Sequence, residues 1–241
     1  MENLSQLKIG FIGAGNMAFA ISQGILKSGD IPPSSVIVSA PSKNNFARFQ
    51  AMGVAVTHSN EEVVDFSCLV FLAVKPHLIP TVINGISEHI TPQHIIVSMA
   101  AGITLATLEE LLPGGSRVMR LMPNLPCMLQ EGALLLACGT GASQEVGALL
   151  KTLLCSCGLV EVGPETWIDA HTGLSGSGVA FGAGRLLRDG GKHPAQLRAE
   201  VCTPGGTTIH GLHALEKGGL RAATMGAVEA ATLRASQLGR K

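Results

Sequence analysis

A glycine-rich turn close to the amino end of the chain constrains the fold most. Ile9 to Ala18 reads I-G-F-I-G-A-G-N-M-A, between an apolar run and an amphipathic stretch. Gly13 permits a tight turn, Gly15 lets the backbone approach a pyrophosphate, and Ala18 allows a helix to pack closely on a strand. The pattern predicts a strand–turn–helix unit that binds a dinucleotide.

Short apolar runs alternate with amphipathic stretches from residue 7 to residue 162, which is typical of a parallel sheet covered on both faces. The predicted strands are Lys8–Ile12, Val36–Ser39, Ala55–Thr57, Leu69–Val74, Ile95–Met99, Arg117–Leu121, Ala133–Ala137 and Leu159–Val162. The predicted helices between them include Met17–Ser28, Phe46–Met52, Pro80–His89 and Gln144–Cys155. We expect an α/β protein with a Rossmann-type doubly wound sheet over residues 1–164.

The strand pattern stops at Glu165. His193–Glu200 and Thr207–Leu238 read as helices, the second of them interrupted by Gly218 and Gly219. We expect residues 165–241 to form a smaller all-α domain.

Composition excludes several classes of protein. The net charge is zero, and the chain has seven Phe, one Trp and no Tyr, so it lacks the basic and aromatic surface that nucleic-acid binding requires. The longest apolar run, Cys68 to Val74, is too short to span a membrane. Because no signal peptide or arginine-rich presequence precedes the first strand, we expect a cytoplasmic protein without a membrane partner.

No metal site is expected. The six cysteines show no zinc-ligand spacing, and most lie in apolar segments, where we expect reduced core residues. His210 and His213 are one helical turn apart, but the sequence offers them no third ligand.

The end of the second predicted strand bears on the choice of cofactor. The acidic residue that would hold a ribose 2′-hydroxyl is missing there, and Ser39, Ser42 and Lys43 occupy the region instead. Hydroxyls and a lysine favour a 2′-phosphate, so NADPH is favoured over NADH. The alternative is a solvated turn in which the lysine has no ligand.

Three further segments follow predicted strands and should line the cofactor site, since ligands of doubly wound sheets bind at the carboxyl ends of strands. Ala73–His77 contains Lys75, Ala100–Gly102 is compact, and Met122–Pro126 contains Asn124. Each could equally be an ordinary loop with a solvated side chain.

A second turn of small residues lies late in the chain. Pro204, Gly205 and Gly206 precede the helix that starts at Thr207. Unpaired N–H groups and the helix dipole favour a small anion such as a carboxylate there. The alternative is an ordinary capped helix with no ligand.

Taken together, these motifs identify the chain as resembling the pyrroline-5-carboxylate reductases over nearly its full length. The segments that carry the resemblance are GFIGAGNMA (10–18), AVKP (73–76), AAG (100–102), MPNLP (122–126), DAHTGLSGSG (169–178) and CTPGGTTI (202–209). The resemblance implies reduction of 1-pyrroline-5-carboxylate to L-proline with NADPH or NADH, by a homo-oligomer built from dimers. It also implies that the helical domain, residues 165–241, binds substrate and dimerises.

The resemblance also implies roles for particular residues. The cofactor would contact Ala14, Asn16, Met17, Asn60, Val74, Lys75 and Ala101, beside Gly13, Gly15 and Asn124, which the turn and the strand-end loop already indicate. The substrate would contact Glu165, Thr203, Gly205, Gly206, Thr207 and Thr208, with Thr208 hydrogen-bonded to the ring nitrogen as the catalytic residue. Where the family can carry a serine for the 2′-phosphate this chain has Ala40, so that contact falls to Ser39, Ser42 or Lys43.

One departure from the family lies after Phe181. The chain runs through the glycine-rich stretch Gly182–Gly191 directly into His193, where the family has long apolar helices that interlock two subunits. We therefore expect an internal deletion near 181–192, from a splice variant or a gene-model error, with weakened dimerisation and low activity. Two alternatives stay open: an inactive isoform that still binds dinucleotide, and another small-substrate dehydrogenase using His171.

Overall fold

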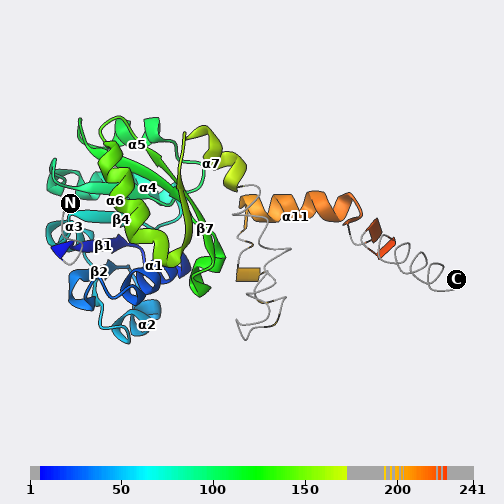
Figure 1. The fold of residues 1–241 in the computed structure, drawn as a ribbon, viewed down its shortest axis with the longest axis horizontal. Coiled ribbons are helices and arrows are strands. Elements are labelled where there is room, and N and C mark those ends of the chain that lie inside the picture. The colour runs from blue at the N-terminus through cyan, green and yellow to red at the C-terminus, as the bar shows by residue number, and fades with distance from the viewer. Residues whose placement is uncertain are drawn as a thin grey trace, which may run out of the picture.

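An eight-stranded sheet forms the centre of the molecule (Figure 1). The computed structural model describes residues 6–172, 193, 196, 199, 200, 202, 204–220, 222, 223, 225 and 226. The strands are β1 (Ile9–Ile12), β2 (Val36–Ser39), β3 (Ala55–Thr57), β4 (Leu69–Leu72), β5 (Ile95–Ser98), β6 (Arg117–Met122), β7 (Gly132–Cys138) and β8 (Gly158–Val162). Their order in space is β3-β2-β1-β4-β5-β6-β7-β8. All eight predicted strands are confirmed, with ends that differ by at most two residues.

Helices connect most of these strands. They are α1 (Asn16–Lys27), α2 (Phe46–Gln50), α3 (Asn60–Phe66), α4 (Ile79–Ile86), α5 (Leu105–Leu111) and α6 (Gln144–Leu154). Two further helices in the described residues, α7 (Thr166–His171) and α11 (Thr207–Lys217), follow the last strand. Short 3₁₀ turns are η2 (Pro33–Ser35), η3 (Lys43–Asn45), η4 (Pro76–Leu78), η5 (Ser87–His89), η6 (Leu125–Leu129) and η7 (Cys155–Cys157). The four helices predicted between strands are confirmed, apart from last turns that tighten into 3₁₀ geometry after α4 and α6. Most of the predicted helix His193–Glu200 lies outside the described residues.

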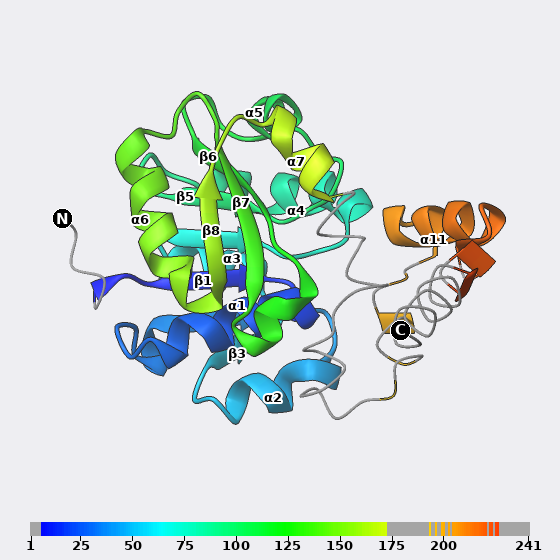
Figure 2. The same cartoon turned by 45° about the vertical axis from the view of Figure 1, so that its right-hand side comes forward.

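The sheet is not parallel throughout, which corrects the expectation of a parallel sheet. β1 to β6 pair in parallel, but β7 pairs with β6 antiparallel, and β8 follows β7 in parallel at the edge of the sheet (Figure 2). The connection from β6 to β7 contains only the turn η6, and a parallel crossover needs a longer segment.

The core consists of one hydrophobic layer on each face of the sheet, because successive strand side chains point to opposite faces. Phe11, Phe71 and Val97 pack beneath α1 and α6, with the rings of Phe11 and Phe71 stacked 4.7 Å apart. Val70 and Ile96 face the other way, toward α3, α4 and α5. The strands β1, β2, β4 and β5 are therefore buried on both sides, as their near-continuous apolar sequences predict, whereas the edge strands β3 and β8 are partly exposed.

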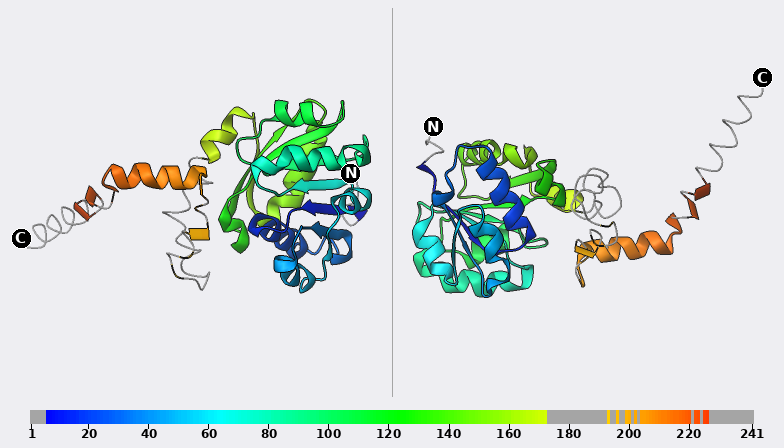
Figure 3. Two further views of the ribbon diagram at one scale, coloured as in Figure 1. Left: turned by 180° about the vertical axis from the view of Figure 1, so that it is seen from behind. Right: turned by 90° about the horizontal axis from the view of Figure 1, so that it is seen from below.

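The helical part of the chain is described over α7 and α11. Ile168 of α7 is fully buried in the second layer of the core, so α7 packs on the sheet although it follows the predicted boundary at 164/165. α11 extends away from the sheet (Figure 3). It ends at Lys217, before Gly218 and Gly219, the latter with a φ of +70°, as the two glycines predict. The predicted deletion at 181–192 lies outside the described residues.

The cysteines differ in exposure, and none forms a disulfide bond in the part of the chain that the structure describes. Burial raises the pKa of the Cys127 thiol to about 11 and that of Cys157 to about 12, so both stay protonated and unreactive at neutral pH. Cys155 is exposed, which departs from the expectation of core cysteines. None of the helices in the described part of the chain has both the length and the apolar character of a membrane crossing.

Candidate functional site

The carboxyl ends of the parallel strands bring the predicted cofactor residues to one edge of the sheet. β1 lies between β2 and β4, so the chain leaves β1 toward one side and returns on the other. Such a topological switch point leaves a crevice outside the carboxyl ends, where ligands of doubly wound sheets bind. The loops after β1, β2, β4, β5 and β6 meet at this edge.

The loop from Gly13 to Gly15 is built to approach a phosphate. Gly13 has a φ of +108°, and a Cβ there would lie 2.7 Å from the carbonyl oxygen of Ala73. Its N–H donates to the carbonyl of Ser39 at 2.9 Å, which ties the turn to β2. Gly15 precedes the 12-residue helix α1 without a side-chain cap, and a Cβ at Gly15 would meet only the Ala73 oxygen, at 4.0 Å. The first N–H groups of α1 therefore face an open position that fits a pyrophosphate.

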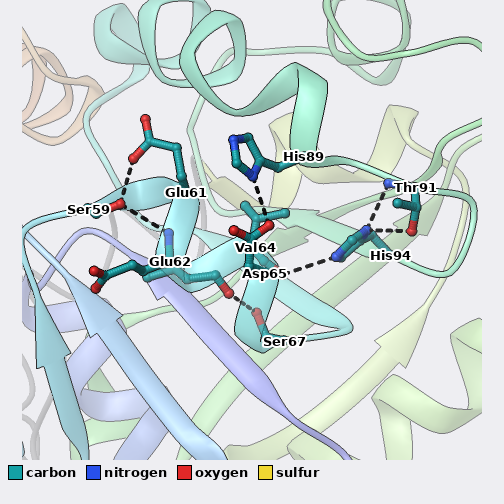
Figure 4. Close-up of polar contacts among 10 residues, drawn as sticks. Ser59, Glu61, Glu62, Val64, Asp65, Ser67, His89, Thr91 and His94 are labelled. Atoms are coloured by element: carbon teal, nitrogen blue, oxygen red, sulfur yellow. Dashed lines mark hydrogen bonds and ion pairs between the residues drawn. The ribbon is translucent and has the colours of Figure 1, made fainter.

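Ser39 and Asn60 contact each other at the adjacent strand end. The Ser39 hydroxyl, fully buried, donates to Asn60 Oδ1 at 2.7 Å. Asn60 opens α3, and its position is fixed by the cap, in which Ser59 Oγ accepts from the Glu62 N–H at 3.1 Å (Figure 4). Ser42 and Lys43 are exposed beyond β2. Ser42 and Lys43 can therefore meet a ligand from solvent, whereas the Ser39 hydroxyl is bonded to Asn60.

The remaining predicted cofactor residues follow β4, β5 and β6. Val74 lies beside the phosphate loop, since a Cβ on Gly13 would be 3.1 Å from its Cγ1. Lys75 is exposed and Ala101 is partly buried. Asn124 is buried, and its Oδ1 accepts from the Ala133 N–H at 2.9 Å, which attaches the turn η6 to the start of β7.

A buried arginine, Arg120, holds Glu165 in place beside the start of α5. Arg120 Nη1 lies 2.6 Å from Glu165 Oε1, and the arginine side chain is only 3% exposed. The same oxygen accepts from the N–H of Leu105 at 2.7 Å, at the start of α5. Because Oε1 already has two donors, Oε2 is the oxygen left to bind a ligand.

The predicted anion-binding turn lies at the start of α11. Gly206 caps the helix without a side-chain hydrogen bond, Thr207 is exposed and Thr208 is buried. Gly205 has a φ of +72°, which a glycine accommodates without strain. Thr203 lies outside the described residues. The helix α11, which this turn precedes, lies outside the sheet whose edge carries the predicted cofactor residues (Figure 1).

His171, the candidate base of the alternative dehydrogenase, has a structural contact. Its Nε2 lies 3.2 Å from the carbonyl oxygen of Ala133 on β7. A ring nitrogen that donates to a backbone carbonyl is not available to exchange a proton with a substrate. The described residues also contain no cluster of three His, Cys, Asp or Glu that could hold a metal.

Two arginines at this site were missed from the sequence. Arg120 interrupts the apolar strand R-V-M-R-L-M, and a charge in a buried strand was the signal that could have revealed it. Arg48 contacts the phosphate loop from α2, and no motif or spacing marks it.

The sheet, its switch point and the uncapped phosphate loop define a dinucleotide-dependent oxidoreductase. Two family models match: "NADP oxidoreductase coenzyme F420-dependent" over residues 8–102 and "Pyrroline-5-carboxylate reductase dimerisation" over residues 179–238. The chain is 63% identical to pyrroline-5-carboxylate reductase 3 of Danio rerio, covering 98% of this chain and 93% of the relative. It is 39% identical to human pyrroline-5-carboxylate reductase 2, covering 96% and 84%. The chain belongs to the pyrroline-5-carboxylate reductase family.

Solved structures agree with this assignment. A pyrroline-5-carboxylate reductase from Coxiella burnetii matches with a TM-score of 0.69 and 30% identity, covering 96% of this chain and 98% of that one. The Plasmodium falciparum pyrroline carboxylate reductase, solved with NADP bound, also has a TM-score of 0.69, at 25% identity and 94% and 96% coverage.

We expect Lys43→Ala to weaken NADPH binding about 5-fold and leave NADH binding unchanged. An exposed lysine beside a phosphate contributes on the order of 1 kcal/mol, and only NADPH carries the 2′-phosphate. Fluorescence titration with both cofactors measures the ratio, with Lys151→Ala as control because Lys151 pairs with Glu161 on the surface. Equal losses for the two cofactors would show that Lys43 does not contact the 2′-phosphate.

Proposed function

We propose that this chain reduces 1-pyrroline-5-carboxylate to L-proline with NAD(P)H, the last step of proline biosynthesis. The observation that carries the proposal is the 63% identity to a named reductase over 98% of the chain. The uncapped phosphate loop at the switch point supports the cofactor class. When bound, the reduced nicotinamide supplies a hydride, and the protein supplies binding and orientation.

The substrate is a cyclic imine that carries a carboxylate. The backbone N–H groups of Gly205 to Thr208 can bind that carboxylate at the start of α11. The Thr208 hydroxyl would hydrogen-bond the ring nitrogen, with Thr203 and Thr207 beside it. Hydride addition to the C=N carbon is favoured when this nitrogen is protonated, and water can supply that proton. Fixing the ring face against the nicotinamide is then the main task of the protein.

Glu165 completes the proposed substrate site from the sheet side. Its negative charge would favour the protonated imine, whose single N–H is bonded to the Thr208 hydroxyl. The support for this role is the pair of donors that fix Oε1.

We also propose that the working unit is a homo-oligomer built from dimers, in the cytoplasm. The dimerisation model that matches residues 179–238 supports association through the helical part. Because α11 extends away from the sheet, a second copy is a suitable partner to bring the anion-binding turn over the cofactor. Membrane or nucleic-acid partners are not part of this proposal.

The relatives contain residues that this chain lacks. The alignment with the Danio rerio reductase runs over 267 positions, whereas the chain has 241 residues. We propose that helices are missing near 181–192, where each lost large apolar side chain removes roughly 1.5–3 kcal/mol of burial from the dimer core.

We expect proline formation to rise at least about tenfold when the missing helices are restored, since the substrate turn then sits in a packed dimer. The measurement compares oxidation of NADPH with 1-pyrroline-5-carboxylate for the two chains, with size-exclusion chromatography of both. NADPH titration is the control, because both chains keep the intact sheet domain. Equal turnover with the same elution volume would contradict the expectation.

A further inference from the structure

Two side chains attach α2 to the phosphate loop. Arg48 Nη2 donates to the carbonyl oxygen of Ala14 at 2.7 Å, and Asn45 Nδ2 donates to the same oxygen at 2.9 Å. A second arm of the guanidinium, Nη1, donates to Asn16 Oδ1 at 2.9 Å. One planar group therefore contacts both the backbone of the loop and the first side chain of α1.

The guanidinium is held in place by two aromatic rings. Its central carbon lies 4.8 Å from the ring centre of Phe19 and 5.4 Å from that of Phe49, and these rings pack edge to face. These cation–π contacts restrict the guanidinium, whose planar fork a flexible lysine could not reproduce.

The charge of Arg48 has no acidic partner among the described residues. None of the ion pairs there includes it, and its Nε is buried without a hydrogen-bond acceptor. Partial burial also lowers the pKa of Arg48, because the charged form loses hydration. A partly dehydrated cation that is bonded only to neutral oxygens favours an anion nearby, and the adjacent loop fits a pyrophosphate.

The contact also determines how Asn16 is oriented. A guanidinium has only donors, so the atom of Asn16 that faces it must be the amide oxygen. The amide nitrogen then points away from Arg48, and Asn16 is exposed at the start of α1, where the helix binds an anion.

We propose that Arg48 is a positioning residue for the pyrophosphate of the cofactor, acting through Asn16. It holds the amide of Asn16 with its N–H groups toward the pyrophosphate, and it adds a positive charge beside the loop. The proposal rests on dinucleotide binding at this loop. Because NADPH and NADH share the pyrophosphate, Arg48 serves both cofactors equally, in contrast to Lys43.

The test is fluorescence titration of Arg48→Met with NADPH and NADH. We expect both affinities to fall by the same factor, on the order of 10-fold. Arg48→Lys should recover only part of the loss, because lysine keeps the charge and lacks the fork. In an Asn16→Ala background, Arg48→Met should cost less than it does in the wild type, because only the contribution of its charge is then lost.

Arg117→Met is the matched control. Arg117 is also partly buried, donates to a backbone carbonyl, that of Gln93, and has an unpartnered Nε, but it lies at the opposite end of β6 from the crevice. Its variant should bind both cofactors like the wild type.

Three outcomes would overturn the proposal. A loss confined to NADPH would make Arg48 a 2′-phosphate residue, and a full additional loss in the Asn16→Ala background would make it a general support of α2. An unchanged affinity for both cofactors in Arg48→Met, or in Arg48→Lys if the methionine variant does not fold, would show that Arg48 does not position the pyrophosphate. Binding of both cofactors to the wild-type protein is measured before any variant. If the wild type binds neither, that result contradicts the proposed function itself rather than the role of Arg48.

Discussion

Gly15→Val should lower the affinity for NADPH and NADH by on the order of 100-fold while the protein keeps its fold. Gly15 has a φ of −75°, which valine can adopt, and a Cβ there would touch nothing closer than 4.0 Å. The added side chain instead occupies the open position before the first N–H groups of α1. A pyrophosphate then cannot reach those donors, which corresponds to a loss of about 2.7 kcal/mol.

Gly13→Ala tests the other glycine of the loop, where we expect a loss of stability rather than of binding alone. Its Cβ would lie 2.7 Å from the backbone oxygen of Ala73 at a φ of +108°, so we expect the folded state itself to be destabilised. Fluorescence titration and thermal unfolding together separate the two glycines. A Gly15→Val protein that binds NADPH like the wild type would contradict the placement of the pyrophosphate.

Arg120→Met should destabilise the sheet domain by about 3 kcal/mol, because removing one partner of a buried ion pair leaves the other charge without compensation. Arg120 is 3% exposed, and Glu165 is 31% exposed, so water offsets only part of the loss. Denaturant unfolding followed by circular dichroism measures the change. The same variant should raise the KM for 1-pyrroline-5-carboxylate, since Glu165 loses one of the two donors that orient it.

Two further variants make this result interpretable. Lys151→Met breaks the exposed pair with Glu161 and should change stability too little to resolve, because exposed ion pairs contribute little. Arg120→Met with Glu165→Gln removes both charges and should be more stable than Arg120→Met alone. Unchanged stability in Arg120→Met would show that the ion pair does not anchor α7 to the sheet.

The phosphate loop and the strands could be predicted because their signals are local. The turn around Gly13 requires a positive φ and the absence of a Cβ. A glycine at this position of the motif meets both requirements. Apolar runs such as Leu69–Leu72 are also local signals, and they indicate strands buried on both faces of a sheet. The reversal at β7 was missed, because apolar patterning carries no information on strand direction.

By itself, the sequence determined the element order, the phosphate loop and the family resemblance. Only the tertiary structure decided that Arg48 reaches Ala14 and Asn16, that Ser39 bonds Asn60, and that Arg120 pairs with Glu165. The partners in each of these contacts are separated by 21 or more residues. Backbone periodicity and turn preferences act over a few neighbouring residues, whereas such contacts depend on how whole strands and helices pack.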